Sequence, residues 1–112
     1  WLKQPGVEET EAQAVFEGSA VYRERIALPD GAKLVIKALS ATGKEHAVTQ
    51  QASNPPMGFK LQIERGFFGG QDGTLLIQIL VHGEVWFSSE PLELPPQGWL
   101  APTTIVLRRP SP

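Results

Sequence analysis

The chain has 112 residues, which is enough for one domain with its own core and too few for two of ordinary size. Its 11 glycines and 10 prolines break it too often for long helices, while a hydrophobic share of 41% argues against disorder throughout. The absence of cysteine excludes disulfides, thiolate metal sites and a cysteine nucleophile, and a net charge of −2 argues against general nucleic-acid binding.

The two ends of the chain differ in character from its middle. Residues 1–14 combine an early Pro5-Gly6 break with three glutamates, which is typical of a solvated arm. Residues 110–112 are expected to be a frayed tail. We therefore predict a single domain over residues 15–109, between a flexible arm and a short tail.

Seven segments show the period of two, or the short apolar runs, that are typical of β-strands. In chain order they are 16–26, 32–40, 45–51, 59–64, 74–82, 85–88 and 103–108. The cleanest alternation is in 59–64, where Phe59, Leu61 and Ile63 are predicted to face the core. Segment 74–82 is apolar on both faces, which is typical of a central strand. Gly18 predicts a bulge or a close approach of the backbone within the first strand.

Turn signals separate these strands about every ten residues. Pro29-Asp30-Gly31 and 41–44 are predicted turns, and 66–73 is a glycine-rich loop. A two-residue turn at His82-Gly83, or at Gly83-Glu84, makes a hairpin of the fifth and sixth strands. Residues 91–102 are predicted to be a long irregular connection.

The fold class follows from these strands and from the absence of any helix-period segment of ten or more residues. Folds with crossover helices between parallel strands are therefore excluded. The sequence predicts an all-β domain: a compact antiparallel β-sandwich, or a small barrel, of about seven strands. Its architecture would be immunoglobulin-like without the disulfide.

Catalytic and metal chemistry have little support in the sequence. His46 and His82 lie on different predicted strands and lack the spacing of metal ligands, so we expect neither a metal nor another cofactor. No serine stands in a Gly-x-Ser-x-Gly elbow, and 66–73 lacks the Lys-Ser/Thr ending of a phosphate loop. We therefore expect that the protein is not an enzyme and has no catalytic residues.

Glu24 is an acidic residue on the apolar face of segment 16–26. A salt bridge with an arginine would explain it, and so would a strand that is leaving the sheet at this point. The functional alternative is a hydrolase, whose pocket would hold Glu24 together with His46 or His82.

Bulky apolar residues in the loops and on the sixth strand are candidate contacts for a partner protein. They are Phe67, Phe68, Trp86, Trp99 and Leu100. The Phe67-Phe68 pair can either cap the open end of the sandwich or contact a partner or a lipid. Trp86 is either exposed at an interface or covered by the connection 91–102.

The sequence VYRERIALP at residues 21–29 is similar to the opening motif of the YbaY/YscW family of bacterial lipoproteins. The likeness continues through 32–40 and 56–63, then through the segments GEVWFSS at 83–89 and TTIVL at 103–107. It therefore spans about residues 16–107.

This resemblance implies a small all-β lipoprotein on the periplasmic face of the outer membrane of a Gram-negative bacterium. The lipid would be carried by a cysteine that this chain does not contain. The ExsB/YscW pilotins of type III secretion systems are the branch it resembles most. That branch implies binding to a secretin subunit, through its C-terminal segment, and assistance with its outer-membrane localisation and assembly.

The other branch of the family implies an envelope lipoprotein of structural or lipid-handling role, without a secretin partner. Neither branch implies catalytic residues or nucleic acid. Small β domains bind segments of other proteins at an exposed strand edge or in a hydrophobic groove. Segments 45–51 and 103–108 are the predicted edges, and the five bulky residues named above are the groove candidates.

Overall fold

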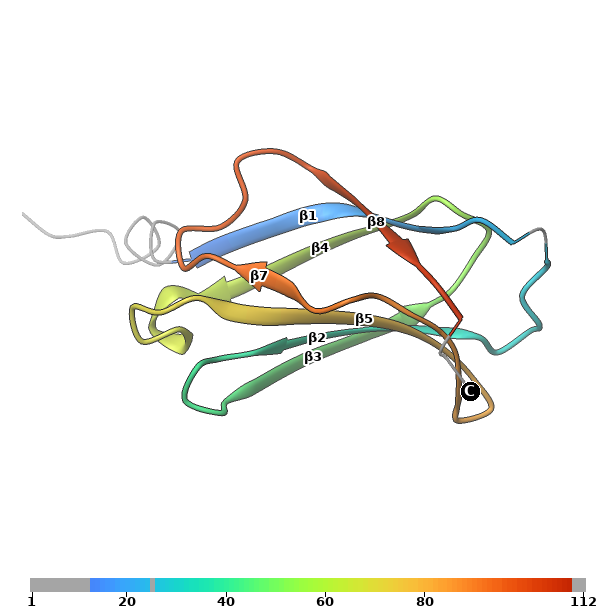
Figure 1. Cartoon of the computed structure of the whole chain (residues 1–112), viewed down its shortest axis with the longest axis horizontal. Helices are drawn as coiled ribbons and strands as arrows, with labels where there is room; N and C mark the ends of the chain where they lie inside the picture. The colour runs from blue at the N-terminus through green and yellow to red at the C-terminus, as the bar shows by residue number, and fades with distance from the viewer. Residues whose placement is uncertain (1–12, 25, 110–112) are drawn as a thin grey trace, which may run out of the picture.

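The computed structural model describes residues 13–24 and 26–109 (Figure 1). The predicted tail at 110–112 and most of the predicted arm lie outside the described residues. Gln13 and Ala14 already belong to the first strand, and Ala14 is completely buried. The domain therefore includes two residues that the sequence assigns to the arm.

The described residues form eight β-strands and one turn of 3-10 helix. They are β1 (Gln13–Tyr22), β2 (Lys33–Leu39), β3 (Glu45–Gln51), β4 (Met57–Glu64), η1 (Arg65–Phe67), β5 (Gly73–Val81), β6 (Glu84–Ser88), β7 (Leu92–Leu94) and β8 (Thr103–Leu107). The predicted all-β fold class is confirmed.

The strands form two sheets, seen as an upper and a lower layer in Figure 1. One sheet has the order β4-β1-β8, and the other has the order β3-β2-β5-β6, with β7 paired to the start of β5. Every strand pair is antiparallel except β1 and β8, which are parallel. The predicted sandwich is confirmed, and the parallel pair is an addition that the turn pattern does not encode. The whole second sheet lies between β1 and β8 in the chain, so no short turn fixes their relative direction.

The core lies between the two sheets. Its largest fully buried side chains are Phe16, Phe68, Phe87, Leu34, Ile36, Leu61, Leu75, Ile77, Ile79, Leu94 and Leu107. On β4 the predicted inward residues Phe59, Leu61 and Ile63 are all buried. β5 lies between β2 and β6, as predicted for a central strand.

Two predicted boundaries are wrong. The first strand ends at Tyr22 and not at Ile26, because the chain leaves the sheet after Tyr22. The connection 91–102 is not irregular throughout, since Leu92–Leu94 pairs with β5 as β7. Three residues between two prolines are too few to show an alternation that the sequence alone could reveal.

The hairpin turn between β5 and β6 is the first of the two predicted alternatives. Val81 pairs with Glu84, which leaves His82 and Gly83 in the turn. Both have positive φ, 51° at His82 and 82° at Gly83, as a type I′ turn requires. The hairpin is therefore set by local backbone geometry.

The two sheets are joined along their sides by specific hydrogen bonds. On one side the Gln50 side-chain amide donates to the carbonyl of Gly58, 3.0 Å away, linking β3 to β4. On the other side β8, red in Figure 1, runs obliquely from the β1 layer toward the β5 layer. Just after β8, the Arg108 and Ser88 backbones exchange two hydrogen bonds of 2.8 and 2.9 Å. This bridge closes one corner of the sandwich.

Candidate functional site

A groove of about 510 Å³ opens beside this bridge, between β8 and the segment that follows β6. Four consecutive residues of β8, Thr103 to Val106, form one wall. Ser88, Ser89, Glu90 and Leu92 line the opposite wall, and Arg108 and Arg109 line the closed end. The groove therefore follows the outer edge of β8, one of the two strand edges that the sequence predicts.

The β8 edge presents backbone hydrogen-bonding groups to this groove. In a strand, the N–H and C=O of one residue point to one side and those of the next residue point to the other. The Arg108 N–H and C=O both bond to Ser88, so those of Thr104 and Val106 point to the same side. Within residues 13–24 and 26–109, β8 pairs only with β1, so these groups have no strand partner.

The opposite wall is held in place by Ser89, which is buried. The Ile77 N–H donates to the Ser89 hydroxyl at 2.9 Å, and the Ser89 N–H donates to the Ile77 carbonyl at 2.8 Å. These two bonds tie the segment after β6 to β5. The Ser89 hydroxyl thus has a structural role, and the groove is bounded by a fixed wall.

A second depression, of about 340 Å³, flanks the end of β8. Arg23, Glu24, Val106, Leu107 and Arg108 line it. Val106 and Arg108 therefore contribute to both hollows. Arginines outnumber carboxylates at this end of the strand, although the chain as a whole has a net charge of −2.

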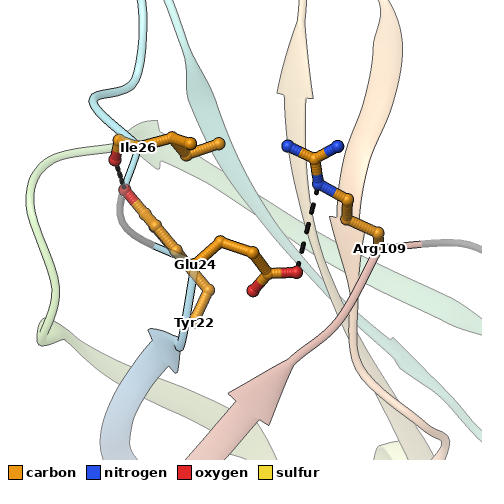
Figure 2. Close-up of polar contacts among 4 residues, drawn as sticks. All are labelled: Tyr22, Glu24, Ile26 and Arg109. Carbon is orange, nitrogen blue, oxygen red and sulfur yellow. Dashed lines mark hydrogen bonds and ion pairs between the residues drawn. The ribbon is translucent and has the colours of Figure 1, made fainter.

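Glu24 faces Arg109 in this region, with 4.0 Å between the Glu24 Oε2 and Arg109 Nε atoms (Figure 2). The predicted ion pair with an arginine is confirmed, and so is the alternative of a strand leaving the sheet, since β1 has ended at Tyr22. The Tyr22 hydroxyl donates to the Ile26 carbonyl at 2.9 Å, which fixes the path of the departing chain. Burial of the phenol raises the pKa of Tyr22 above its ordinary value of 10.0.

Stacked aromatic rings help to position Arg109. The Tyr22 and Phe87 rings stack with centroids 4.5 Å apart, and the Arg109 guanidinium lies 5.9 Å from the Phe87 centroid. That distance is within the range of a cation–π contact. Arg109 is thus placed at the closed end of the groove by Glu24 and Phe87 together.

The hydrolase alternative needs Glu24 and a histidine in one pocket. His46 pairs with Ala38 near one end of the larger sheet, whereas His82 is in the turn at the opposite end. Ala38 also pairs with Leu75 on β5, and His82 follows Leu75 by seven positions, which is roughly 20 Å along the strand. Neither histidine lines the depression beside Glu24. The structure does not bring this catalytic set together.

The Phe67-Phe68 pair divides between surface and core. Phe68 is completely buried, and its ring meets Phe16 edge-on at 5.9 Å. Phe68 is therefore a core residue that caps the sandwich, and it offers no surface to a partner. Phe67 is half-buried and lies between Phe68, at 5.3 Å, and His46, at 6.4 Å.

Trp99 and Leu100 are adjacent in sequence but differ in surroundings. Trp99 is half-buried against Phe16 and Phe59, with ring centroids 5.4 and 6.5 Å apart. Leu100 is fully exposed, at 103% of its reference area. Phe68 and Trp99 thus both contact Phe16, while Phe67 contacts Phe68. Leu100 follows Trp99 at the surface.

Trp86 belongs to another part of the molecule. The pairing of β5 with β6 slips at this residue, because Ile79 pairs with Phe87 while Leu80 pairs with Val85. This irregularity lets Phe87 be buried and Val85 exposed, and leaves Trp86 half-buried against the core. The structure therefore does not gather all five predicted contact residues on one surface.

The groove residues Thr104, Val106 and Arg108 are not among the predicted contact residues, although segment 103–108 is a predicted edge. The sequence feature that could have identified them is a β-branched strand that ends in two arginines. Among the described residues, no three His, Asp or Glu side chains converge as a metal site would require. None of the helical structure in the described part has the length and apolarity needed to cross a membrane.

No protein-family model matches the chain, and no curated protein matches it. Among solved structures, the fold is similar to that of an alternative pilotin from the type II secretion system of Vibrio cholerae, with a TM-score of 0.63. The two are 20% identical, and the matched region covers 88% of this chain and 99% of the pilotin chain. The chain therefore has the fold of this secretion-system pilotin. The YbaY/YscW resemblance and the type III assignment stay predictions.

Proposed function

We propose that the protein is a pilotin: a lipoprotein of the outer membrane that binds a secretin subunit and assists its localisation and assembly there. The observation that carries the proposal is the similarity of its fold to nearly the whole of a pilotin chain. The motif at residues 21–29, which resembles the YbaY/YscW lipoproteins, supports it independently.

The second part of the proposal concerns the type of secretion system to which the partner secretin belongs. The sequence resemblance favours a type III secretin, as for the ExsB/YscW pilotins, whereas the structural neighbour belongs to a type II system. We propose the type III secretin as the partner and treat a type II secretin as the alternative. The partner segment is the C-terminal segment of the secretin subunit.

The mechanism needs binding and not catalysis. A lipid on a cysteine outside this chain would direct the complex to the outer membrane, on its periplasmic face. The β domain would cover a segment of the secretin that otherwise aggregates. The groove beside β8 is the binding surface we propose, because it combines a free strand edge with a fixed opposite wall.

Calorimetric titration of the purified chain tests the proposal. Peptides covering the C-terminal segments of the type III and type II secretins of the same bacterium serve as ligands, and scrambled peptides serve as controls. We expect the type III peptide to bind with a Kd of about 10 µM or tighter, or roughly −7 kcal/mol. Binding of the type II peptide alone would reassign the system. Binding of neither peptide to the folded protein would contradict the proposal and favour the envelope-lipoprotein alternative.

A further inference from the structure

We propose that the partner segment binds as an additional β-strand along the outer edge of β8, and that it carries an acidic side chain at the end that meets Arg108. The inference rests on the proposed function for the identity of the partner. It adds the conformation of the bound segment, the backbone groups that hold it and the charge that it must carry.

The first argument is the hydrogen-bonding capacity of the edge. The Thr104 and Val106 N–H and C=O groups point into the groove and have no strand partner within the described residues. Groups spaced by two residues match the repeat of an extended chain, not that of a helix. An added strand would continue the ladder that the bridge between Arg108 and Ser88 begins.

The second argument is the shape of the groove. The bridge is antiparallel, so the segment after Ser88 runs opposite to β8 and then leaves it to pair with β5 as β7. A wedge-shaped opening results, with Arg108 at its closed end and Thr103 at its open end. Val106 and Leu92, which are both half-buried, line this opening and supply apolar contact for the side chains of an extended segment.

The third argument is charge. Arg108 and Arg109 line the closed end of the groove, and Arg23 lines the adjoining depression. Glu24 and Glu90 are the only acidic residues among the linings of these two hollows. An acidic side chain on the partner would gain charge-assisted hydrogen bonds from the guanidinium groups at this end.

The β3 edge, also predicted from the sequence, is less suited to an added strand. Its Gln50 side chain already bonds to β4, which covers part of the side where the two sheets meet. Four of its residues, Glu45, Ala47, Thr49 and Gln51, are exposed, and neither of the two hollows beside β8 includes a residue of β3. The open edge of β8 is therefore the site we assign.

Backbone methylation of the bound peptide tests the binding mode. The probe is the secretin C-terminal peptide with one N-methyl group, moved along its sequence and titrated into the intact chain. An added strand predicts at least tenfold weaker binding at every second position and less than twofold change at the positions between. Uniform sensitivity, or none, would overturn strand addition while leaving the proposed function intact. If the unmodified peptide does not bind, the proposed function fails and this inference fails with it.

Amide hydrogen exchange tests the site on the protein. We expect exchange at Thr104 and Val106 to slow at least tenfold when the peptide is bound. The amide of Ile105 faces β1 and is the matched control, because its exchange should not change. Slowed exchange elsewhere, with Thr104 and Val106 unaffected, would contradict the assignment to β8.

Charge reversal tests the arginine end. Arg108→Glu should weaken peptide binding at least tenfold, because the exposed Arg108 side chain lines both hollows while its backbone alone makes the bridge. Lys44→Glu, in the turn between β2 and β3, makes the same charge change away from the groove and should alter binding less than twofold. Equal effects of the two variants would show that only net charge matters and would overturn the Arg108 contact.

Discussion

Gly18 on β1 and Thr103 on β8 are in direct register, and a Cβ atom at position 18 would collide with the carbonyl oxygen of Thr103. Of the two predicted reasons for a glycine here, the close approach of the backbone is confirmed. The pairing of β1 with β4 runs through Gly18 without a shift, so no bulge forms. The parallel pair that carries the candidate groove therefore depends on a residue without a side chain.

Gly18→Ala should destabilise the fold by about 1–3 kcal/mol, since the colliding atom is backbone and β8 must move. Urea denaturation followed by circular dichroism measures the loss. Gly58→Ala is the matched control on the neighbouring strand β4, where a Cβ would meet nothing within 4 Å. Similar stability of both variants would show that β1 and β8 can separate without cost.

Phe68→Ala should lower the free energy of unfolding by about 3–5 kcal/mol, because it leaves a cavity at a fully buried site against Phe16. Leu100→Ala removes an apolar side chain that is fully exposed, so its effect should stay within about 0.5 kcal/mol. Thermal unfolding of the two variants beside the parent chain separates these outcomes. A tolerated Phe68→Ala change would contradict the assignment of Phe68 to the core.

Tyr22 is the only tyrosine of the chain, so ultraviolet absorbance of the phenolate reports its titration directly. We expect a midpoint above the ordinary pKa of 10.0 in the folded protein, because burial disfavours the phenolate. Since the folded-state pKa is raised, stability falls as the pH rises through it. The same titration in denaturant is the control, and an equal midpoint there would contradict burial of the phenol.

Tyr22→Phe removes the hydrogen bond to the Ile26 carbonyl but keeps the ring that stacks on Phe87. The free energy of unfolding, measured by denaturant titration, should fall by about 0.5–1.5 kcal/mol. Peptide binding in the groove should not change, because Tyr22 does not line it. Weaker binding in this variant would indicate that the chain path after β1 shapes the groove.

Glu93 on β7 shares a side-chain hydrogen bond with Asp72, which raises the pKa of Glu93 above 4.5, and repulsion between the two carboxylates raises it further. A raised folded-state pKa means that the folded protein holds the proton more tightly, so this stabilisation is present below pH 4.5 and is lost as the pH rises. Glu93→Gln should therefore flatten the decline of the Tm as the pH rises above 4.5. An unchanged pH profile in this variant would show that the pair does not couple to folding.

The larger part of the fold is readable from the sequence because alternation records which face of a strand is buried. Phe59, Leu61 and Ile63 are assigned to the core on this basis and are buried. Turns with special backbone needs are also local, as the positive φ values at His82 and Gly83 show. Short strands such as Leu92–Leu94 are not predicted from the sequence, because so few residues cannot show a period.

The candidate site is less predictable, since its parts meet only in three dimensions. Phe67 and Phe68 are adjacent phenylalanines, and only the packing of Phe68 on Phe16 separates a core residue from a half-buried one. Arg109 becomes the partner of Glu24 because β8 runs parallel to β1 and ends beside it. No local pattern in either segment encodes that contact.

The sequence by itself determined an all-β sandwich, the inward faces of its strands and two candidate strand edges, because period-two burial and turn chemistry act over a few residues. The resemblance to the YbaY/YscW lipoproteins, and not the composition, implies a lipid-bearing cysteine that the chain does not contain. Only the tertiary structure decided that β8 pairs in parallel with β1 and bridges to Ser88, which leaves a groove between two walls. Such long-range pairing depends on the packing of the whole core, in which segments from both ends of the chain must fit at the same time.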